Sequence, residues 1–285
     1  MKLKEVLDRT IQFFKDKNIE TPRLEAEILL AEAMGFKNRV DLYLKFEQPL
    51  KEEELTRSRD FVRRRIQGEP VAYITGRKEF FGISFFVSSA VLIPRPETEL
   101  LAEEAIAWIK KQNLTNPQIL DLGCGSGCIG LAILKNIPEA VLTAVDKSEQ
   151  ALEFAKMNAE KLNLNERTKF ILSDIQSLKM IDQKFDVIIA NPPYIAENDP
   201  EVQIEVRKYE PHLALFSGPN GAEALKSWSE KSVPLLKDLA WMGFEMGWTQ
   251  SEMMQEQFKQ LKLKNVKIIK DLSGMNRHIT GEKNG

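Results

Sequence analysis

Cysteine and histidine are scarce in this chain, with only two residues of each type among 285. The cysteines, Cys124 and Cys128, are four positions apart and have no histidine or second cysteine pair nearby. Structural zinc sites gather four such ligands at characteristic spacings. We therefore expect no metal site, and we interpret both cysteines as small residues that fill a tight loop.

The sequence also lacks an excess of either charge and any long apolar run. Its formal net charge is −2 and its pI is about 6.0, whereas nucleic-acid-binding domains usually carry a basic excess. The one conspicuous basic run, Arg63–Arg65, is expected on the solvent face of a helix. Lys2, Lys4 and Glu5 interrupt the first residues, and no apolar stretch approaches the ~20 residues that span a bilayer. We expect a cytoplasmic protein without a signal peptide.

What the sequence has instead is a change of pattern near residue 90. Before it, apolar residues recur at helical spacing and predict helices near residues 3–14, 22–35, 39–44 and 51–67. Short aromatic runs at 79–81 and 84–87 predict a β-hairpin. After it, helices and strands alternate as in a parallel α/β sheet. We predict a helical domain over 1–75, a hairpin linker over 76–95 and an α/β domain over 96–285.

A glycine-rich loop follows the first apolar strand of the α/β region and precedes an apolar helix. Strand, glycine-rich turn and helix together begin a nucleotide-binding unit. The spacing departs from the dinucleotide pattern, and the carboxylate of Asp121 before the first glycine suits a cationic or amino-bearing ligand better than a pyrophosphate. The candidate ligand-binding residues of this motif are Asp121, Gly123, Cys124, Gly125, Ser126 and Gly127.

Two later strands also end in carboxylates. The strand predicted over 140–146 ends at Asp146, about 20 residues after the glycines, where an acid can bind the two hydroxyls of a ribose. The strand predicted over 169–174 ends at Asp174, near the expected position of an adenine edge, and Ile175 follows it. Three acids at strand ends beside a glycine-rich turn indicate a nucleoside-containing ligand.

The tetrad Asn191-Pro192-Pro193-Tyr194 directly follows the apolar strand predicted over 185–190. Two successive prolines end a strand and stiffen the loop, because proline fixes φ and has no N–H. The Asn191 oxygen and the Pro192 carbonyl can each accept one N–H of a planar NH₂ group, on which the ring of Tyr194 can pack. Asn-Pro is also ordinary turn punctuation, but beside the glycine-rich loop the tetrad indicates methylation of an amide or aromatic amine.

These motifs, in this order, resemble the amino-methylating methyltransferases that use S-adenosylmethionine. More narrowly, nearly the whole chain is similar to the release factor glutamine methyltransferases, the HemK/PrmC family. Three further stretches carry this resemblance: Gly68–Gly76, Leu92–Glu99 and Gly218–Gly221. The tetrad itself is shared with adenine and guanine methyltransferases, so the other stretches carry the substrate assignment.

The resemblance implies a seven-stranded Rossmann-like sheet, with an antiparallel pair made by late strands over 266–270 and 277–280, after a strand over 240–246. It also implies S-adenosyl-L-methionine as the methyl donor and the glutamine of the Gly-Gly-Gln loop of peptide-chain release factors as the target, methylated at N5. Asn191, Pro192 and Tyr194 would be catalytic, and the tetrad including Pro193 would bind the substrate. The cofactor would contact the glycine-rich loop, Asp146, Asp174, Ile175 and Asn191. No metal, membrane or nucleic-acid partner is expected, and the protein is expected to be a monomer.

Two departures from the family pattern concern the cofactor pocket and one turn. Ile175 stands where many members have an aromatic or bulkier residue, so adenine would pack on it without stacking. The glycine that usually precedes the fifth strand is absent from the stretch beginning at Leu239. A nucleic-acid amino methyltransferase and a non-catalytic nucleotide-binding adaptor stay open as alternatives.

Other conspicuous side chains have structural interpretations. Glu97 and Glu99 suit the first turn of a helix over 98–109 better than an acid–base pair. The tryptophans at 228, 241 and 248 are expected to be packing residues. His278 is expected to be structural, while a role for His212 in closing the site stays open.

Overall fold

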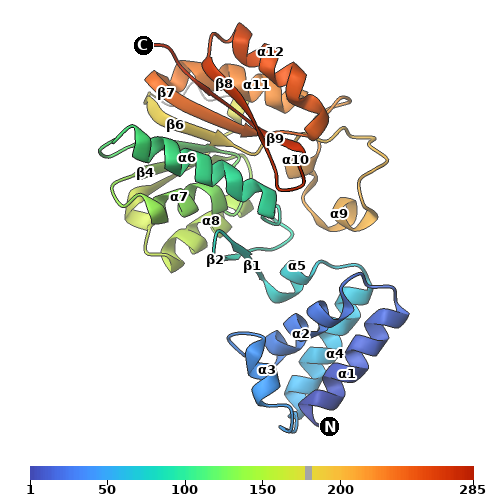
Figure 1. Ribbon diagram of the computed structural model, residues 1–285. Helices are drawn as coiled ribbons and strands as arrows, with labels where there is room; N and C mark the ends of the chain where they lie inside the picture. Colours follow the sequence, from blue (N-terminus) through green and yellow to red (C-terminus); the bar gives the residue numbers. More distant parts are fainter. Residues whose placement is uncertain (177–181) are drawn as a thin grey trace. The chain divides into compact units, whose positions relative to one another are not determined.

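The computed structural model describes residues 1–176 and 182–285 (Figure 1). Two compact units are present: one comprises Met1–Arg77 with Ile204–Tyr209, and the other comprises Lys78–Gln203 with Glu210–Gly285. We call them the helical unit and the sheet unit. The hairpin therefore lies in the sheet unit from Lys78 onward, and a short later helix lies in the helical unit. Within the described residues, no helix is long and apolar enough to cross a membrane.

The helical unit is built from amphipathic helices whose apolar faces share one core. Leu3, Leu7 and Phe14 of the first helix are buried with Leu29 and Leu30 of the second. The helices are α1 (Leu3–Asp16), α2 (Pro22–Ala33), α3 (Val40–Leu44), α4 (Glu52–Ile66), α5 (Val71–Thr75) and α9 (Ile204–Tyr209).

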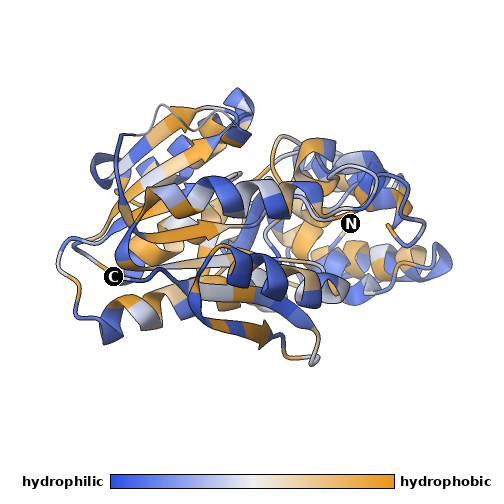
Figure 2. Cartoon of the chain, turned by 90° about the horizontal axis from the view of Figure 1, so that it is seen from above, coloured by the Kyte–Doolittle hydropathy of each residue, from blue (hydrophilic) through white to orange (hydrophobic). Residues whose placement is uncertain are grey.

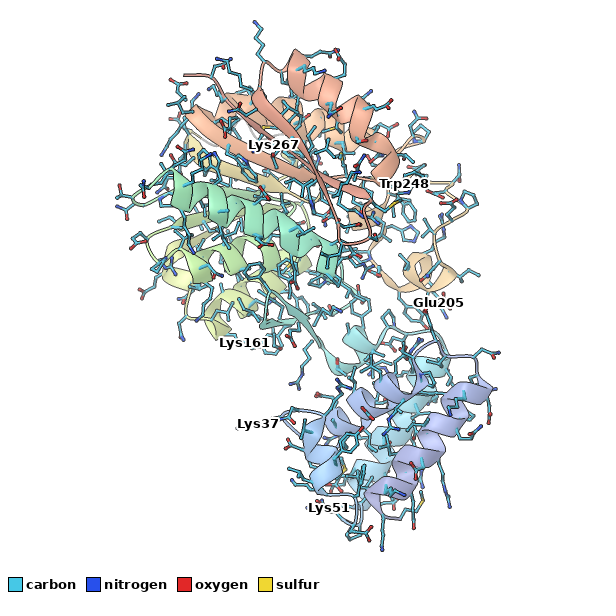
Figure 3. All side chains as sticks on the ribbon, in the orientation of Figure 1. Lys37, Lys51, Lys161, Glu205, Trp248 and Lys267 are labelled. Carbon is cyan, nitrogen blue, oxygen red and sulfur yellow. The ribbon has the colours of Figure 1, made fainter. Side chains whose placement is uncertain are left out.

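Helix α9 packs on the turn that ends α4. The Tyr209 hydroxyl donates to the Gln67 carbonyl at 2.8 Å. A Cβ at Gly68 would lie 3.2 Å from Cγ of Glu205, the α9 residue labelled in Figure 3. The turn at Gly68, with φ of +94°, therefore fits against α9 without a side chain.

The prediction of a solvated arginine face on α4 is wrong for two of its three arginines. Arg65 Nε lies 2.5 Å from a carboxylate oxygen of Glu25 on α2, and the arginine side chain is only 18% exposed. Arg64 forms two hydrogen bonds to Glu69, at 2.7 and 2.5 Å, just after α4. Only Arg63, 68% exposed, matches the prediction. Both arginines are held by acidic residues outside α4, Glu69 and Glu25. The apolar periodicity of α4 alone gives no information about these partners.

The sheet unit contains a seven-stranded sheet with the order β5-β4-β3-β6-β7-β9-β8. Five strands are parallel, and β9 pairs antiparallel with both β7 and β8, which confirms the predicted fold class and late antiparallel pair. The strands are β3 (Gln118–Leu122), β4 (Val141–Asp146), β5 (Thr168–Leu172), β6 (Phe185–Ala190), β7 (Leu236–Glu245), β8 (Lys264–Lys270) and β9 (Asn276–Glu282).

Helices cover both faces of this sheet. Successive side chains of a strand point to opposite faces, and the central strands carry apolar side chains on both, so both faces must be buried. Ile119 faces a core with helices α6, α7 and α8, whereas its neighbour Leu120 faces a second core with α11 and α12. Figure 2 shows hydrophobic colouring along the central strands and mixed colouring along the helices. These helices are α6 (Glu99–Lys111), α7 (Cys128–Asn136), α8 (Glu149–Lys161), α11 (Glu223–Ser232) and α12 (Ser251–Gln260), with α10 (His212–Leu215) in a connecting segment.

The hairpin consists of β1 (Arg77–Phe80) and β2 (Ile83–Phe86), with the turn at Phe81 and Gly82. Asn158 of α8 is fully buried, and its carboxamide accepts from Phe86 N at 2.7 Å and donates to Phe86 O at 3.1 Å. The same amide donates to Ser126 O at 2.9 Å. Asn158 thereby joins the hairpin to the glycine-rich loop. Glu99, predicted to open α6, is its first residue and also accepts from Phe81 N at 2.8 Å.

Leu239, where the family glycine is absent, does not form a turn before the strand: it lies inside β7 in the left-handed conformation, with φ of +63°. The pairing register between β6 and β7 shifts here, from Phe185 opposite Leu236 to Val187 opposite Trp241. Leu239 is 70% exposed, so its side chain gains little burial to offset the strain. The irregularity forms without glycine because the paired segments of β7 on either side of it fix the backbone.

Candidate functional site

The register of the parallel strands brings the predicted motifs to one edge of the sheet. Leu122 is paired with Val145 on one side and with Ala190 on the other. The residues that follow these strand ends, including Gly123, Asp146 and Asn191, therefore lie side by side. Between β3 and β6 the strand order reverses, and such a switch point opens a crevice at the carboxyl ends of the strands.

A cavity of about 350 Å³ occupies this crevice, a size typical of small-molecule sites. Of the sequence-predicted site residues, its lining includes Gly123, Cys124, Gly125, Ser126, Asp146, Asp174, Ile175, Asn191 and Pro193. Asp121, Gly127, Pro192 and Tyr194 are not among the lining residues. Of these four residues, Asp121 and Pro192 are buried next to residues that line the cavity.

The glycine-rich loop wraps around the end of β4. Gly123 N and Cys124 N both donate to Val145 O, at 2.8 and 3.0 Å. Gly123 has φ of +68°, and a Cβ there would lie only 2.7 Å from the ring of Trp228. Glycine is therefore required at this position for both its conformation and its lack of a side chain.

Trp228 of α11 lines the cavity, a role that sequence reasoning did not assign. Trp228 follows the Gly218–Gly221 stretch by only a few residues. This stretch was the feature of the sequence that could have indicated a site residue here. On the same side, Ile175 is 4% exposed, and Ser227 donates to Gln176 at 2.7 Å. Ile175 and Trp228 both line the cavity, and apolar side chains of this kind suit a flat aromatic group.

Asp146 is held in place from both oxygens. Oδ2 accepts from Gly125 N at 2.9 Å, and Oδ1 accepts from Ser148 N at 2.9 Å, at the start of α8. Burial raises the pKa of Asp146 above its ordinary value, although these backbone donors oppose the shift. A carboxylate has about four acceptor positions, so two remain to accept hydroxyl groups from a ligand.

Asp121 lies beneath the loop and is 1% exposed. Its Oδ2 accepts from Gly130 N at 3.0 Å, whereas Oδ1 has no partner among the described residues. Burial raises the pKa of Asp121 to about 7, and the nearby charge of Asp146 adds to this. The site thus contains a carboxyl group that changes charge near neutral pH.

The tetrad divides into a free amide and a fixed ring. Among the described residues the Asn191 carboxamide has no hydrogen-bond partner, and Asn191 lines the cavity. Pro192 is buried behind it. The Tyr194 hydroxyl donates to Glu245 at 3.1 Å, and burial raises the pKa of Tyr194 well above its ordinary value. Tyr194 therefore stays protonated at neutral pH and cannot serve as a base.

One wall of the cavity is held by an ion pair that sequence reasoning also missed. Arg95 Nη2 lies 2.5 Å from a carboxylate oxygen of Glu210, whose side chain is 2% exposed. Glu210 also accepts from Ile93 N at 3.3 Å. Arg95 and the neighbouring Pro211 both line the cavity. The ion pair connects the segment just before α6 to the segment that follows the tetrad.

The cysteines and histidines occupy distinct places. Burial raises the pKa of Cys124 well above its ordinary value and that of Cys128 to about 12, so both stay thiols. His212 begins α10 and packs edge-on against Phe216 at 5.2 Å between ring centroids. His278 of β9 is fully buried beside Glu245. Within residues 1–176 and 182–285, no cluster of three or more His, Cys, Asp or Glu side chains could hold a metal ion.

Comparisons of the sequence with known families match both parts of the chain. Residues 5–76 match the family described as the PrmC N-terminal domain, and residues 98–208 match the methyltransferase small domain. A release factor glutamine methyltransferase of Rhodopirellula baltica is 42% identical over 286 residues, which cover 98% of this chain and 95% of the relative. A protein of the same name from Koribacter versatilis is 36% identical over 284 residues, which cover 99% of this chain and 99% of the relative.

Solved structures share the fold at low sequence identity. The catalytic domain of hMettl16, solved in complex with the MAT2A 3′UTR hairpin 6, superposes with a TM-score of 0.55 at 19% identity, over 82% of each chain. The T. thermophilus 16S rRNA N2 G1207 methyltransferase gives a TM-score of 0.52 at 15% identity and covers 73% of this chain and 50% of its own. These similarities confirm the methyltransferase fold, while the near-full-length sequence relatives show that the chain belongs to the family of release factor glutamine methyltransferases.

Proposed function

We propose that this protein transfers a methyl group from S-adenosyl-L-methionine to the side-chain amide nitrogen, N5, of the glutamine in the Gly-Gly-Gln loop of peptide-chain release factors. The observation that carries this proposal is the Asn191 carboxamide, which lines the cavity and has no partner among the described residues. An amide kept free of protein hydrogen bonds can accept an N–H of the substrate. Relatives of nearly the same length bear the name of this activity.

The lining residues fit the methyl donor. Asp146 has two acceptor positions left for the ribose hydroxyls, and Ile175 and Trp228 supply apolar lining for the adenine. The carboxyl groups of Asp146 in the lining and of Asp121 beneath the loop favour a ligand with positive charge. When bound, the donor supplies an activated methyl group on a sulfonium, so the chain's residues need only bind, orient and exclude water.

The task of the tetrad is to prepare a weak nucleophile. An amide nitrogen has its lone pair delocalised into the carbonyl group, and Tyr194 stays protonated and cannot remove a proton. We infer that the Asn191 oxygen and the Pro192 carbonyl accept the two N–H groups, and that Tyr194 and Pro193 shape the surrounding pocket. These acceptors stabilise positive charge as it develops on nitrogen, and a preorganised site makes such stabilisation effective. Alignment of the amide nitrogen with the methyl group supplies the rest of the rate enhancement.

We propose that the helical unit recognises the release factor. No residue before Ala90 lines the cavity, so this unit has another task. Its helix α3 exposes Val40 at 63%, Tyr43 at 43% and Leu44 at 78%. Adjacent exposed apolar side chains of this kind are typical of protein interaction surfaces.

The test is methyl transfer to purified release factor with labelled S-adenosylmethionine and no added metal, followed by mass spectrometry of the Gly-Gly-Gln peptide. We expect a single added methyl group on the glutamine and none after Asn191→Asp, because the added carboxylate strengthens ground-state attraction to the sulfonium without improving the transition state. Asn136→Asp on the exposed end of α7 is the matched control and should retain activity. Label in adenine or guanine with unmodified release factor would replace this proposal by a nucleic-acid methyltransferase.

A further inference from the structure

A buried carboxylate lies next to the Asn191–Tyr194 loop. Glu245 is the last residue of β7 and is only 2% exposed. Because Phe244 is paired with Ala190 of β6, the next residues on the two strands, Glu245 and Asn191, lie at the same sheet edge. Neither the cofactor motifs nor the tetrad includes Glu245, and it does not line the cavity.

Two hydroxyl groups and one imidazole surround this carboxylate. Oε1 accepts from the Tyr194 hydroxyl at 3.1 Å, and Oε2 accepts from Thr98 Oγ1 at 2.5 Å. His278 Nε2 lies 3.5 Å from Oε2. Burial raises the pKa of Glu245, but these neighbours outweigh burial and hold the pKa below its ordinary value. The ionised carboxylate therefore keeps the Tyr194 hydroxyl oriented as a donor.

The segment that begins at Glu245 also holds Tyr194 by its backbone and its ring. Gln250 Nε2 donates to Tyr194 O at 3.0 Å and to Gly221 O at 3.1 Å, while Gln250 Oε1 accepts from Gly247 N at 2.8 Å. A Cβ at Gly247 would lie 3.6 Å from Cδ2 of Tyr194. Hydroxyl, carbonyl and ring edge are thus all fixed by residues 245–250.

Stability alone is a poor explanation for Glu245. Among the described residues it has no ion pair with lysine or arginine, and His278 is its only basic neighbour within 4 Å. A buried charge is costly even with good partners, and an apolar side chain of similar size often packs as well or better. A role in the tetrad explains the buried carboxylate better, because Glu245 lies beside the tetrad and accepts a hydrogen bond from the Tyr194 hydroxyl.

We propose that Glu245 is a positioning residue for methyl transfer, whose carboxylate fixes the Tyr194 hydroxyl and through it the conformation of the Asn191–Tyr194 loop. This role rests on the proposed function, because it concerns how the tetrad presents an amide nitrogen to the methyl donor. Loss of the bond frees the ring to rotate and the loop to shift, and a misplacement near 1 Å costs about 10²-fold in rate.

The kinetic experiment is a double-mutant cycle of Glu245→Gln and Tyr194→Phe on methyl transfer to release factor. Each single variant should lower kcat by about tenfold or more, with the KM for S-adenosylmethionine unchanged, since neither residue lines the cavity. The double variant should be no slower than the slower single variant, because both remove the same bond. Wild-type kcat in either single variant, or losses that multiply in the double variant, would overturn the proposal.

Glu282→Gln is the matched control, since Glu282 lies on β9 opposite Trp241 of β7, four residues before Glu245, and accepts from Trp108 Nε1 at 3.0 Å. Its kcat should equal that of the wild type. Circular dichroism checks that Glu245→Gln is folded. If it is not, the kcat of Tyr194→Phe alone tests the proposal, because this variant removes one oxygen and leaves Glu245 with Thr98 and His278.

Hydrogen exchange separates this role from the proposed function. Backbone amides of residues 191–197, such as Ile195 N bonded to Leu215 O at 3.0 Å, should exchange about tenfold faster in Tyr194→Phe and Glu245→Gln than in wild type or Glu282→Gln. A wild-type protein that methylates no release factor refutes the proposed function, and the exchange rates then decide the role of Glu245. Unchanged exchange in both variants refutes that role whatever the substrate.

Discussion

Asp121→Asn should change how the stability of the sheet unit depends on pH. Asp121 is 1% exposed, has one oxygen without a partner among the described residues, and titrates with a pKa of about 7 in place of 3.8 because of burial. Between these two pH values the folded state keeps a proton that the unfolded state has released. The free energy of unfolding of the wild type therefore falls as pH rises from about 4 to about 7 and is level above that.

The size of this effect follows from the two pKa values. At 1.36 kcal/mol for each tenfold change in affinity, a pKa of about 7 against 3.8 corresponds to about 4 kcal/mol. The carboxamide that replaces the carboxyl group cannot titrate, and its oxygen can still accept from Gly130 N. The variant should therefore gain about 4 kcal/mol relative to the wild type between pH 4 and pH 8.

Urea unfolding followed by tryptophan fluorescence measures this difference, because all four tryptophans lie in the sheet unit. Asp238→Asn is the control, since its side chain is 76% exposed on the same sheet, and it should follow the wild-type profile. A stability difference between Asp121→Asn and wild type that stays constant from pH 4 to pH 8 would refute the reasoning.

The remaining predictions concern the ligand, the partner and the left-handed residue Leu239. Asp146→Ala should weaken S-adenosylmethionine binding about tenfold or more in calorimetric titration, since charge-assisted hydrogen bonds contribute about 1.5–3 kcal/mol each; unchanged affinity would remove Asp146 from the site. A fragment lacking residues 1–77 should bind S-adenosylmethionine yet fail to methylate intact release factor, and full activity would show that the helical unit is dispensable. Leu239→Gly should raise the free energy of unfolding by about 1 kcal/mol, because it relieves a left-handed backbone at an exposed side chain; urea unfolding that gives an equal or lower value would contradict this. Trp248, labelled in Figure 3, is 51% exposed three residues beyond Glu245, so Trp248→Ala should raise the KM for release factor without changing cofactor affinity; equal KM values would exclude it from the interface.

Much of the sheet could be predicted from the sequence because its signals are local. Apolar runs predicted the parallel strands, and β6 begins at Phe185 and ends at Ala190 as expected, since the prolines after Asn191 cannot continue a strand. Pro22 marked the start of α2 for a related reason, because its fixed φ suits the first helical position. Such features depend on a few neighbouring residues and are readable without the fold.

Other features depend on partners far along the chain, and only the tertiary structure decided them. Glu245 meets Tyr194 across 51 positions because β7 lies beside β6, and Glu210 meets Arg95 across 115. The exposure of Arg65 was mispredicted for the same reason, since Glu25 on another helix holds it. The sequence by itself determined the ends of β4 at Asp146 and of β6 at Ala190, whereas β5 ends at Leu172, two residues before the predicted end at Asp174. The order and register of the strands determined which of those ends share a cavity, because pairing between distant segments sets these distances and local propensity does not.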